Sequence, residues 1–187
     1  MREISLHILD LVQNSIEAGA TSVTLEISEF LAVDEMIIKV SDNGRGMNEQ
    51  LRQLVIDPFI TTRTTRRIGL GLPLMEMSTK RCNGYLKIDS TPGKGTVVKA
   101  MYKHSHFDRP PLGNLVETIK NILVANPELH FLYRHTVNDN VFSVSSEELA
   151  SILDGIPLTQ PDVLIWLHGY LSDNIANLYG GAKDENN

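Results

Sequence analysis

The sequence predicts a mixed α and β protein built in two parts, and three observations support this. Residues 4–18 place apolar side chains at helical spacing. Residues 21–27 alternate polar and apolar with a period of two, which is typical of a strand with one buried face. Charge divides the chain: residues 1–103 carry 13 Lys and Arg against 12 Asp and Glu, whereas residues 104–187 carry 4 against 11. We therefore expect a domain boundary near His104.

The remaining elements follow from periodicity and from turn residues. In the first part we expect a helix that Gly19 ends as a C-cap, then strands at 21–27 and 36–40, a short helix at 51–56, a helix at 73–81, and strands at 85–89 and 96–101. In the second part we expect a helix at 112–125, a hairpin of 129–137 with 141–144, a helix capped by Ser145 or Ser146 that runs through Leu153, and a helix at 161–179. The predicted division is 1–103, a linker at 104–111, a small α+β unit at 112–179 and a disordered tail at 180–187.

Composition excludes several classes of protein. No apolar run approaches the roughly 20 residues that a membrane-spanning helix needs. The first residues lead directly into a helical pattern without a signal segment, so we expect a cytoplasmic protein. The single cysteine, Cys82, cannot form an internal disulfide. The acidic second part argues against a nucleic-acid duplex as its partner.

The first candidate site follows the apolar run at 36–40 and reads Asp42-Asn43-Gly44-Arg45-Gly46. Glycine lets the backbone adopt positive φ and lets a flat ligand approach closely. Asp42 supplies an acceptor for an exocyclic amine such as N6 of adenine. An ordinary Asn-Gly turn between two strands explains the same residues, so the motif alone leaves both interpretations open.

A polar stripe on the first helix is the second candidate. Asp10, Asn14 and Glu17 fall at i, i+4 and i+7, opposite the apolar side. A solvated helix face accounts for the stripe. Alternatively, Asn14 supplies a neutral oxygen to Mg²⁺, and Asp10 orients or deprotonates a water molecule.

The segment 57–68 combines one proline, one phenylalanine, four threonines and three arginines. Hydroxyl and guanidinium groups at this density suit a polyphosphate, but a solvated basic loop or a docking patch for an acidic protein fits equally well. Gly69-Leu70-Gly71-Leu72 follows and precedes a helix, where free N–H groups make an anion site. The segment is neither a Walker loop nor a dinucleotide fingerprint. Farther along the chain, Gly95-Thr96 can place a hydroxyl at the base of a pocket, as can any hairpin with these residues.

Taken together and in order, these stretches resemble the motifs of the GHKL ATPases, the superfamily of DNA gyrase, large heat-shock chaperones, sensor histidine kinases and MutL. The matching stretches are Asp10…Asn14…Glu17, Asp42-x-Gly44-x-Gly46, Asp57-Pro58-Phe59-x-Thr61-Thr62, Gly69-Leu70-Gly71-Leu72 and Gly93-x-Gly95-Thr96. The resemblance covers about residues 1–103. The segment that leads into Gly-Leu-Gly-Leu looks most like a sensor histidine kinase, whereas the helix at 11–20 looks more like MutL.

The resemblance implies a fold, a cofactor and a set of roles. The fold is an α/β two-layer sandwich, a mixed sheet with helices on one face, here with a small C-terminal α+β domain added. The implied cofactors are ATP and Mg²⁺. By analogy, Asp42 accepts from adenine N6, Asn14 binds Mg²⁺, and Thr96 approaches the adenine through water. Gly44 and Gly46 give the base room, and the phosphates are surrounded by Thr61, Thr62, Arg63, Gly69, Leu70 and Gly71.

Two departures from the family pattern matter. Many members that hydrolyse ATP carry glutamate at the position of Asp10, and a shift of about 1 Å in a catalytic group can cost roughly 100-fold in rate. We therefore expect hydrolysis to be slow or absent. No dimerising helices precede residue 4, so we also expect that the chain is not a complete sensor kinase. His106 lies in a weak likeness to the phosphoacceptor box, but consecutive prolines at 110 and 111 favour a linker.

The sequence thus predicts a cytoplasmic Mg·ATP-binding protein of the histidine-kinase-like class that acts on or regulates a partner protein. The acidic residues 104–187, with several aromatics, are expected to contact that partner. The alternative is a non-enzymatic nucleotide sensor in which ATP orders 57–68 and so creates or hides a docking surface. MutL-like work on DNA fits the short, acidic chain less well. The oligomeric state is left open.

Overall fold

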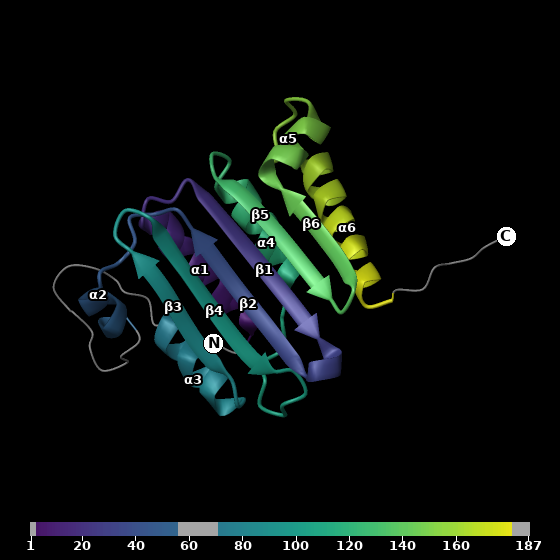
Figure 1. Ribbon diagram of the computed structural model, residues 1–187. Helices are drawn as coiled ribbons and strands as arrows, with labels where there is room; N and C mark the ends of the chain where they lie inside the picture. The colour runs from purple at the N-terminus through teal and green to yellow at the C-terminus, as the bar shows by residue number, and fades with distance from the viewer. Residues whose placement is uncertain (1–2, 56–70, 181–187) are drawn as a thin grey trace.

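The computed structural model describes residues 3–55 and 71–180. The strands are β1 (Ser22–Phe30), β2 (Glu35–Asp42), β3 (Tyr85–Thr91), β4 (Gly95–Lys103), β5 (His130–Val137) and β6 (Asn140–Ser145). The α-helices are α1 (Ile4–Glu17), α2 (Glu49–Leu54), α3 (Gly71–Arg81), α4 (Leu115–Ala125), α5 (Ser146–Leu153) and α6 (Pro161–Leu178), and a 3-10 turn covers Leu31–Val33. Figure 1 shows these elements along the chain.

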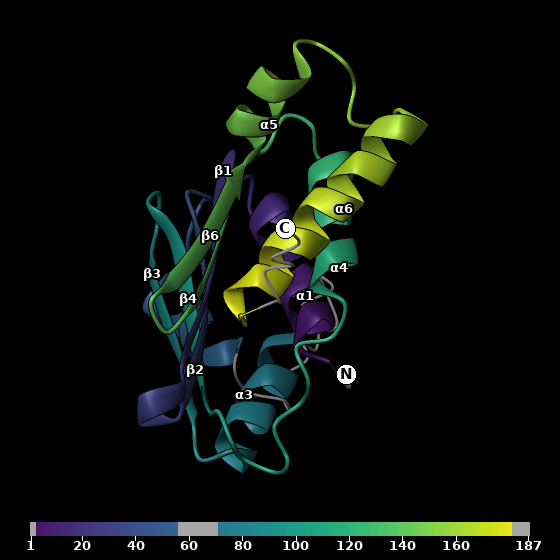
Figure 2. The same ribbon diagram turned by 90° about the vertical axis from the view of Figure 1, so that its right-hand side faces the viewer.

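All six strands form one mixed sheet in the order β3-β4-β2-β1-β5-β6. β1 and β5 run parallel, and every other neighbouring pair is antiparallel. In the view of Figure 2, helices α1, α3, α4 and α6 lie on one side of the sheet. This arrangement confirms the predicted two-layer fold, a mixed sheet with helices on one face.

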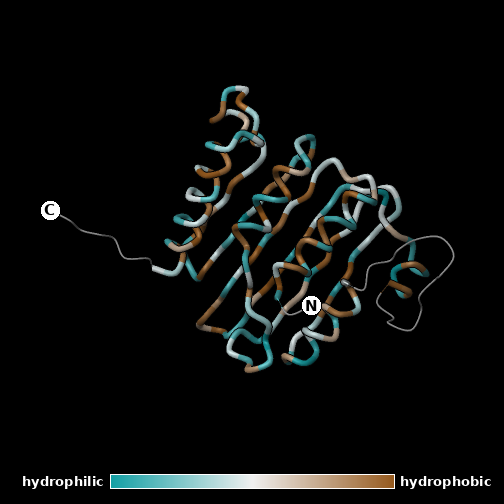
Figure 3. The backbone as a smooth tube through the Cα atoms, turned by 180° about the vertical axis from the view of Figure 1, so that it is seen from behind, coloured by the Kyte–Doolittle hydropathy of each residue, from teal (hydrophilic) through white to brown (hydrophobic). Residues whose placement is uncertain are grey.

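The period-two patterns explain how the sheet acquires two different faces. In β1, Val23, Leu25 and Ile27 are fully buried against the helices, whereas Thr24 and Glu26 are half-exposed on the opposite face. The helices bury an apolar stripe in turn; that of α1 includes Ile4, Ile8, Leu11 and Val12. Seen from the helical side, hydrophobic and hydrophilic segments alternate along helices and strands (Figure 3). Burial of these stripes is the main force that holds the two layers together.

The two ends of α1 are stabilised in different ways. At the C-terminal end, Gly19 adopts φ +77°, its N–H donates to the Ile16 carbonyl at 2.8 Å, and Ala20 N–H donates to Ser15 at 3.1 Å. This pair of bonds is a Schellman motif, so Gly19 lies one residue past the C-cap, Ala18. At the N-terminal end, Ile4 N–H donates to the carbonyl of Pro111 at 3.0 Å. The segment expected as a linker therefore packs on the first helix and satisfies one of its free donors.

Two helices begin elsewhere than expected because a side chain caps them. α2 begins at Glu49 rather than 51, since Asn48 accepts a hydrogen bond from Leu51 N–H at 2.8 Å. α4 begins at Leu115 rather than 112, since Asn114 accepts from Glu117 N–H at 3.1 Å. The other expected elements are present with shifts of a few residues at their ends.

The C-terminal segment extends the sheet. The predicted hairpin is present as β5 and β6, and β5 pairs with β1 from Ser22 opposite His130 to Glu29 opposite Val137. A single hydrophobic core contains residues from both parts of the chain. A two-stranded hairpin is marginal by itself, so its pairing with β1 stabilises both strands. The division at 104–111 stays a prediction about folding units, and residues 181–187 of the expected tail lie outside the described part.

Candidate functional site

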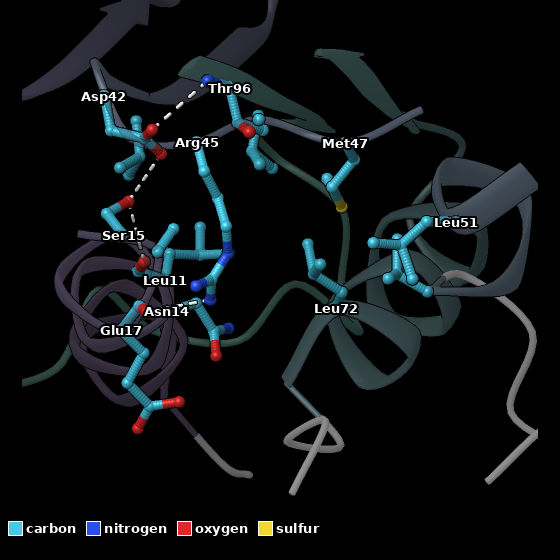
Figure 4. A pocket seen from close by; sticks show the side chains of 15 residues that line it. Leu11, Asn14, Ser15, Glu17, Asp42, Arg45, Met47, Leu51, Leu72 and Thr96 are labelled. Atoms are coloured by element: carbon cyan, nitrogen blue, oxygen red, sulfur yellow. Dashed lines mark hydrogen bonds between the residues drawn. The ribbon is translucent and has the colours of Figure 1, made fainter. Parts of the chain in front are cut away.

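A pocket of about 460 Å³ opens between α1 and the ends of β2 and β4. Figure 4 shows its side chains: Asp42 and Thr96 at one end, Asn14, Ser15 and Glu17 of α1 along one side, and Leu51 and Leu72 opposite. The lining is mainly apolar and comprises Leu11, Asn14, Ser15, Glu17, Ala18, Val40, Asp42, Arg45, Gly46, Met47, Leu51, Val55, Leu72, Thr96 and Val98. A mostly apolar pocket of this size with few polar groups is typical of small-molecule sites.

Asp42 ends β2 inside this pocket with its carboxylate held by three donors. Oδ1 accepts from the N–H groups of Gly44 at 2.9 Å and Thr96 at 3.2 Å. Oδ2 accepts from the hydroxyl of Ser15 at 2.8 Å. An ionised carboxylate offers about four acceptor directions, so these three bonds leave one on Oδ2.

The turn after Asp42 is fastened to the end of α1. Asn43 Oδ1 accepts from the N–H groups of Thr21 and Ser22, both at 2.9 Å. The Arg45 guanidinium donates from Nη2 to the Glu17 carbonyl at 2.8 Å, where a positive charge is favourable at a helix C-terminus. The Asn-Gly turn that was the simpler interpretation of this motif therefore also fixes the position of Asp42 in the pocket.

Gly44 and Gly46 are needed for contacts within the protein. A Cβ on Gly46 would lie 2.1 Å from the carbonyl oxygen of Thr91, and its φ is +64°. A Cβ on Gly44 would lie 3.0 Å from Cβ of Ala18. Close packing thus explains both glycines, and the expectation that they give a base room stays a prediction. Gly46 lines the pocket as well.

Thr96 lines the pocket with its hydroxyl engaged by a neighbour. Its Oγ1 lies 2.9 Å from Oγ of Ser90 on the adjacent strand, and Ser90 also accepts from Met47 N–H at 2.8 Å. The clearest role of Thr96 is therefore to donate a hydrogen bond from its backbone N–H to Asp42. Its expected approach to adenine through water stays a prediction.

Asn14 and Asp10 occupy successive turns of α1 near the start of α3. Asn14 lines the pocket, whereas Asp10 lies beside it against Gly71, where a Cβ would come within 1.6 Å of Asp10 Oδ2. Oδ2 is buried and has no hydrogen-bond partner in the described part of the chain. Burial raises the pKa of Asp10, the charge of Glu17 raises it further, and the N–H of Gly71 opposes both. This carboxylate is thus a better proton acceptor than an exposed aspartate.

The rest of the predicted phosphate site lies outside the described residues. This holds for Thr61, Thr62, Arg63, Gly69 and Leu70; of the predicted phosphate-binding residues only Gly71 is described, as the first residue of α3.

Sequence reasoning missed two residues that shape the pocket, Ser15 and Arg45. Ser15 is only 4% exposed and bonds Asp42. The sequence signal for Ser15 was that a polar residue next to Asn14 lies among the apolar positions of the helix. No role was predicted for Arg45, which is a variable position between the two glycines of the motif. Its side chain is nevertheless long enough to reach α1.

The comparison with protein families shows the family of the domain that contains this pocket. The family described as histidine kinase-, DNA gyrase B-, and HSP90-like ATPase matches residues 2–105, more than half of the chain. The chain belongs to this ATPase family. Membership confirms the predicted resemblance to the GHKL ATPases and implies that the domain binds ATP.

Part of this chain is similar to part of several curated bacterial kinases. Sporulation kinase C of Bacillus subtilis is 32% identical over 93 residues, which are 50% of this chain and 22% of that protein. Sensor protein kinase FleS of Pseudomonas aeruginosa is 36% identical over 89 residues, 48% of this chain and 22% of the kinase. The matched region thus spans about a fifth of each of these relatives.

A crystal structure of the N-terminal domain of a DNA repair protein shares the fold. Its TM-score is 0.55 at 16% identity, over 83% of this chain and 58% of that chain. Since 83% of the chain extends beyond residues 2–105, the shared fold includes part of the C-terminal segment. Among the described helices, none has the length and apolarity needed to cross a bilayer.

Proposed function

We propose that this protein binds Mg·ATP in the pocket beside α1 and that the nucleotide regulates, or reacts with, a partner protein. The observation that carries the proposal is Asp42: its carboxylate is fixed by three donors, faces the pocket and keeps one acceptor direction free. The supporting context is the ATPase family and its kinase relatives in bacterial signalling.

Adenine suits the end of the pocket at Asp42. The exocyclic amine donates to the free direction of Oδ2, and the apolar walls at Val40, Met47 and Val98 pack against the faces of the base. A fixed acceptor in an apolar pocket selects strongly for a donor, because a base without one leaves the carboxylate desolvated and unpaired.

The donor set also suits Mg²⁺ bound with a polyphosphate. Mg²⁺ usually takes one or two protein oxygens and completes its shell with phosphate oxygens and water. Asn14 Oδ1 supplies one neutral oxygen, and the described residues contain no cluster of three acidic, histidine or cysteine ligands that would hold a cation without phosphates. When bound, the ion neutralises charge on the phosphates. The N-terminus of α3 faces Asp10 and favours negative charge in the same region.

The role of Asp10 decides between two functions. As a general base it activates a nucleophile for hydrolysis or phosphotransfer, and its raised pKa supports that role. A specific observation favours the second candidate, a nucleotide sensor without turnover: Asp10 does not line the pocket in the described structure and its Oδ2 is buried against Gly71. A cytoplasmic location and a partner contact through residues 104–187 belong to the proposal in either case.

Calorimetric titration of Mg·ATP tests the proposal. The wild type is expected to bind, Asp42→Ala to lose at least 100-fold in affinity, about 3 kcal/mol, and Asp89→Ala, an exposed carboxylate on β3, to bind as the wild type does. Turnover assays on the wild type and Asp10→Asn then separate the candidates. If the protein is an enzyme, Asp10→Asn loses turnover but still binds ATP. If it is a sensor, neither the wild type nor Asp10→Asn shows turnover. Binding that is equal in the wild type and Asp42→Ala contradicts the proposed site.

A further inference from the structure

The face of the sheet opposite the helices carries a row of cations that the nucleotide site does not use. Strand register places one residue from each of five strands in line: Lys87 of β3, Lys99 of β4, Lys39 of β2, Glu26 of β1 and Arg134 of β5. Their neighbours along the strands are buried, or half-buried in the case of Leu86, on the other face, so all five point away from the helices. We call this set the basic row.

The basic row holds like charges side by side. Lys87 lies directly opposite Lys99, which in turn lies opposite Lys39. Like charges in directly opposed cross-strand positions destabilise a sheet. Folding alone does not favour this arrangement, and an external anionic partner would stabilise it.

Internal partners neutralise only part of the row. Lys39 pairs with Glu26 at 2.6 Å, and Lys87 pairs with Asp89 at 2.8 Å. Lys99 lies 5.9 Å from the centre of the Tyr85 ring. No carboxylate of residues 3–55 or 71–180 lies within 4.0 Å of Lys99 or Arg134, so two cations remain for an external anion.

An apolar row runs beside the basic row. This apolar row lies two positions along the strands from the basic row and consists of Tyr85, Met101 and Ile37, which are aligned on the same face. Tyr85 is 41% exposed. In Figure 1 this face is toward the viewer and the helices lie behind it. No described helix covers it. A surface with adjacent charged and apolar rows is suited to a protein partner.

The spacing of the row matches an α-helix. Neighbouring strands are about 4.8 Å apart, so the row from β3 to β5 spans about 19 Å. One turn of helix rises 5.4 Å, and about 13 residues cover that span. A helix with one carboxylate per turn and apolar residues on the adjacent face thus complements both rows.

We propose that this sheet face is the docking site for an acidic amphipathic helix of a partner protein. The proposal rests on the proposed function, because it supplies a surface through which the nucleotide-bound protein meets its partner. It adds to the contact proposed for residues 104–187, since only Arg134 of the basic row comes from that segment.

The charges of the chain favour a protein over a nucleic acid. Glu26 stands within the row and Asp89 beside it, so a continuous polyanion meets repulsion at both, whereas a helix can leave a position uncharged. The whole chain carries a net charge of −6. A second copy is the other anionic candidate, because residues 135–182 contain six Asp and Glu and no Lys or Arg.

Fluorescence anisotropy with a labelled peptide tests the proposal. The probe is a 16-residue helical peptide with a Leu row and one Glu per turn, except for a Gln in the turn that would face Glu26, and its control carries Gln in place of every Glu. We expect the Glu peptide to bind wild type and the Gln peptide at least tenfold more weakly. The variant Lys39→Gln/Lys87→Gln/Lys99→Gln should lose at least tenfold in affinity for the Glu peptide. Lys80→Gln/Arg81→Gln/Lys120→Gln, which removes the same charge from the helical layer, should bind as wild type does.

A single change keeps the test valid if the triple variant does not fold. Lys99→Gln removes a like-charge neighbour on both sides, so it should raise Tm by about 1–2 °C while peptide affinity falls about threefold. Equal peptide binding by wild type and Lys99→Gln overturns the proposal. The proposal is also overturned if a 12-nucleotide single-stranded DNA binds more tightly than the Glu peptide. It is overturned as well if the wild type is a dimer and Lys99→Gln dissociates that dimer. Mg·ATP affinity, measured on the same samples, should not change; failure of wild type to bind ATP refutes the proposed function and not the docking site.

Discussion

Two carboxylates of the sheet, Asp42 and Glu29, each accept three hydrogen bonds but differ in whether a ligand can reach them. Asp42 accepts three hydrogen bonds at the end of β2 and lines the pocket, where a ligand can use its remaining acceptor capacity. Glu29, toward the other end of β1, is 3% exposed and accepts from His104 at 2.7 Å, from His135 at 2.9 Å and from the Tyr179 hydroxyl. Asp42 can therefore serve a ligand, whereas Glu29 serves the fold.

The Glu29 network joins segments that are distant in the chain. Tyr179 follows α6, His135 lies on β5, and His104 follows β4. Tyr133 extends the network, with its hydroxyl 2.8 Å from Nδ1 of His135. Burial raises the pKa of Tyr179, and its bond to Glu29 raises it further, so the hydroxyl stays protonated as a donor. The network thus fastens the C-terminal segment to β1.

Removing Glu29 should have the largest effect on stability. In Glu29→Ala the ring N–H of His135, which is 0% exposed, loses its acceptor, and we expect a loss of about 4 kcal/mol in the free energy of unfolding. Urea denaturation measures it. Glu26→Ala, three residues earlier on the exposed face, is the control and should cost less than about 1 kcal/mol. Equal losses in the two variants would show that the network contributes no more than a surface ion pair.

Acid should weaken the same network. Burial alone raises the pKa of Glu29, but the hydrogen bonds from His135, Tyr179 and His104 outweigh burial and lower it to about 2, from 4.5. A depressed pKa stabilises the folded state above the unfolded value, and this contribution is lost as pH falls from about 4.5 toward 2. The shift corresponds to about 3 kcal/mol. Unfolding free energies measured between pH 6 and 3 should fall more steeply for the wild type than for Glu29→Gln, and parallel curves would contradict this assignment.

Ser15→Ala should have the smallest effect, and on the nucleotide rather than on the fold. The change removes one donor to Asp42 Oδ2 and leaves the carboxylate less well oriented. We expect ATP affinity to fall about fivefold, or about 1 kcal/mol, as measured by calorimetry. Ser41→Ala, whose residue precedes Asp42 and points to the open face of the sheet, should bind as wild type does.

The difference between the two carboxylates also shows what a sequence can predict. Asp42 was predictable because it lies in a local motif after an alternating strand, and the helices and strands were predictable from periodicity. Glu29 was not, since its partners stand at 104, 135 and 179, and only the tertiary fold brings them together. The pairing of β5 with β1 was missed for the same reason: parallel register between distant strands leaves no local pattern. Ser15 was missed because a helix periodicity marks which residues are buried but not which buried hydroxyl reaches a carboxylate.

The most direct test of the central claim, that Asp42 reads the adenine amine, compares Mg·ATP with Mg·ITP by calorimetry. Inosine presents a carbonyl oxygen where adenine presents the 6-amino group, so the free acceptor of Asp42 meets a second acceptor. The account predicts that wild type binds ATP at least tenfold more tightly than ITP and that Asp42→Asn, whose amide can also donate, loses this preference. Equal affinities of wild type for ATP and ITP would contradict the assignment of Asp42 as the adenine-reading residue.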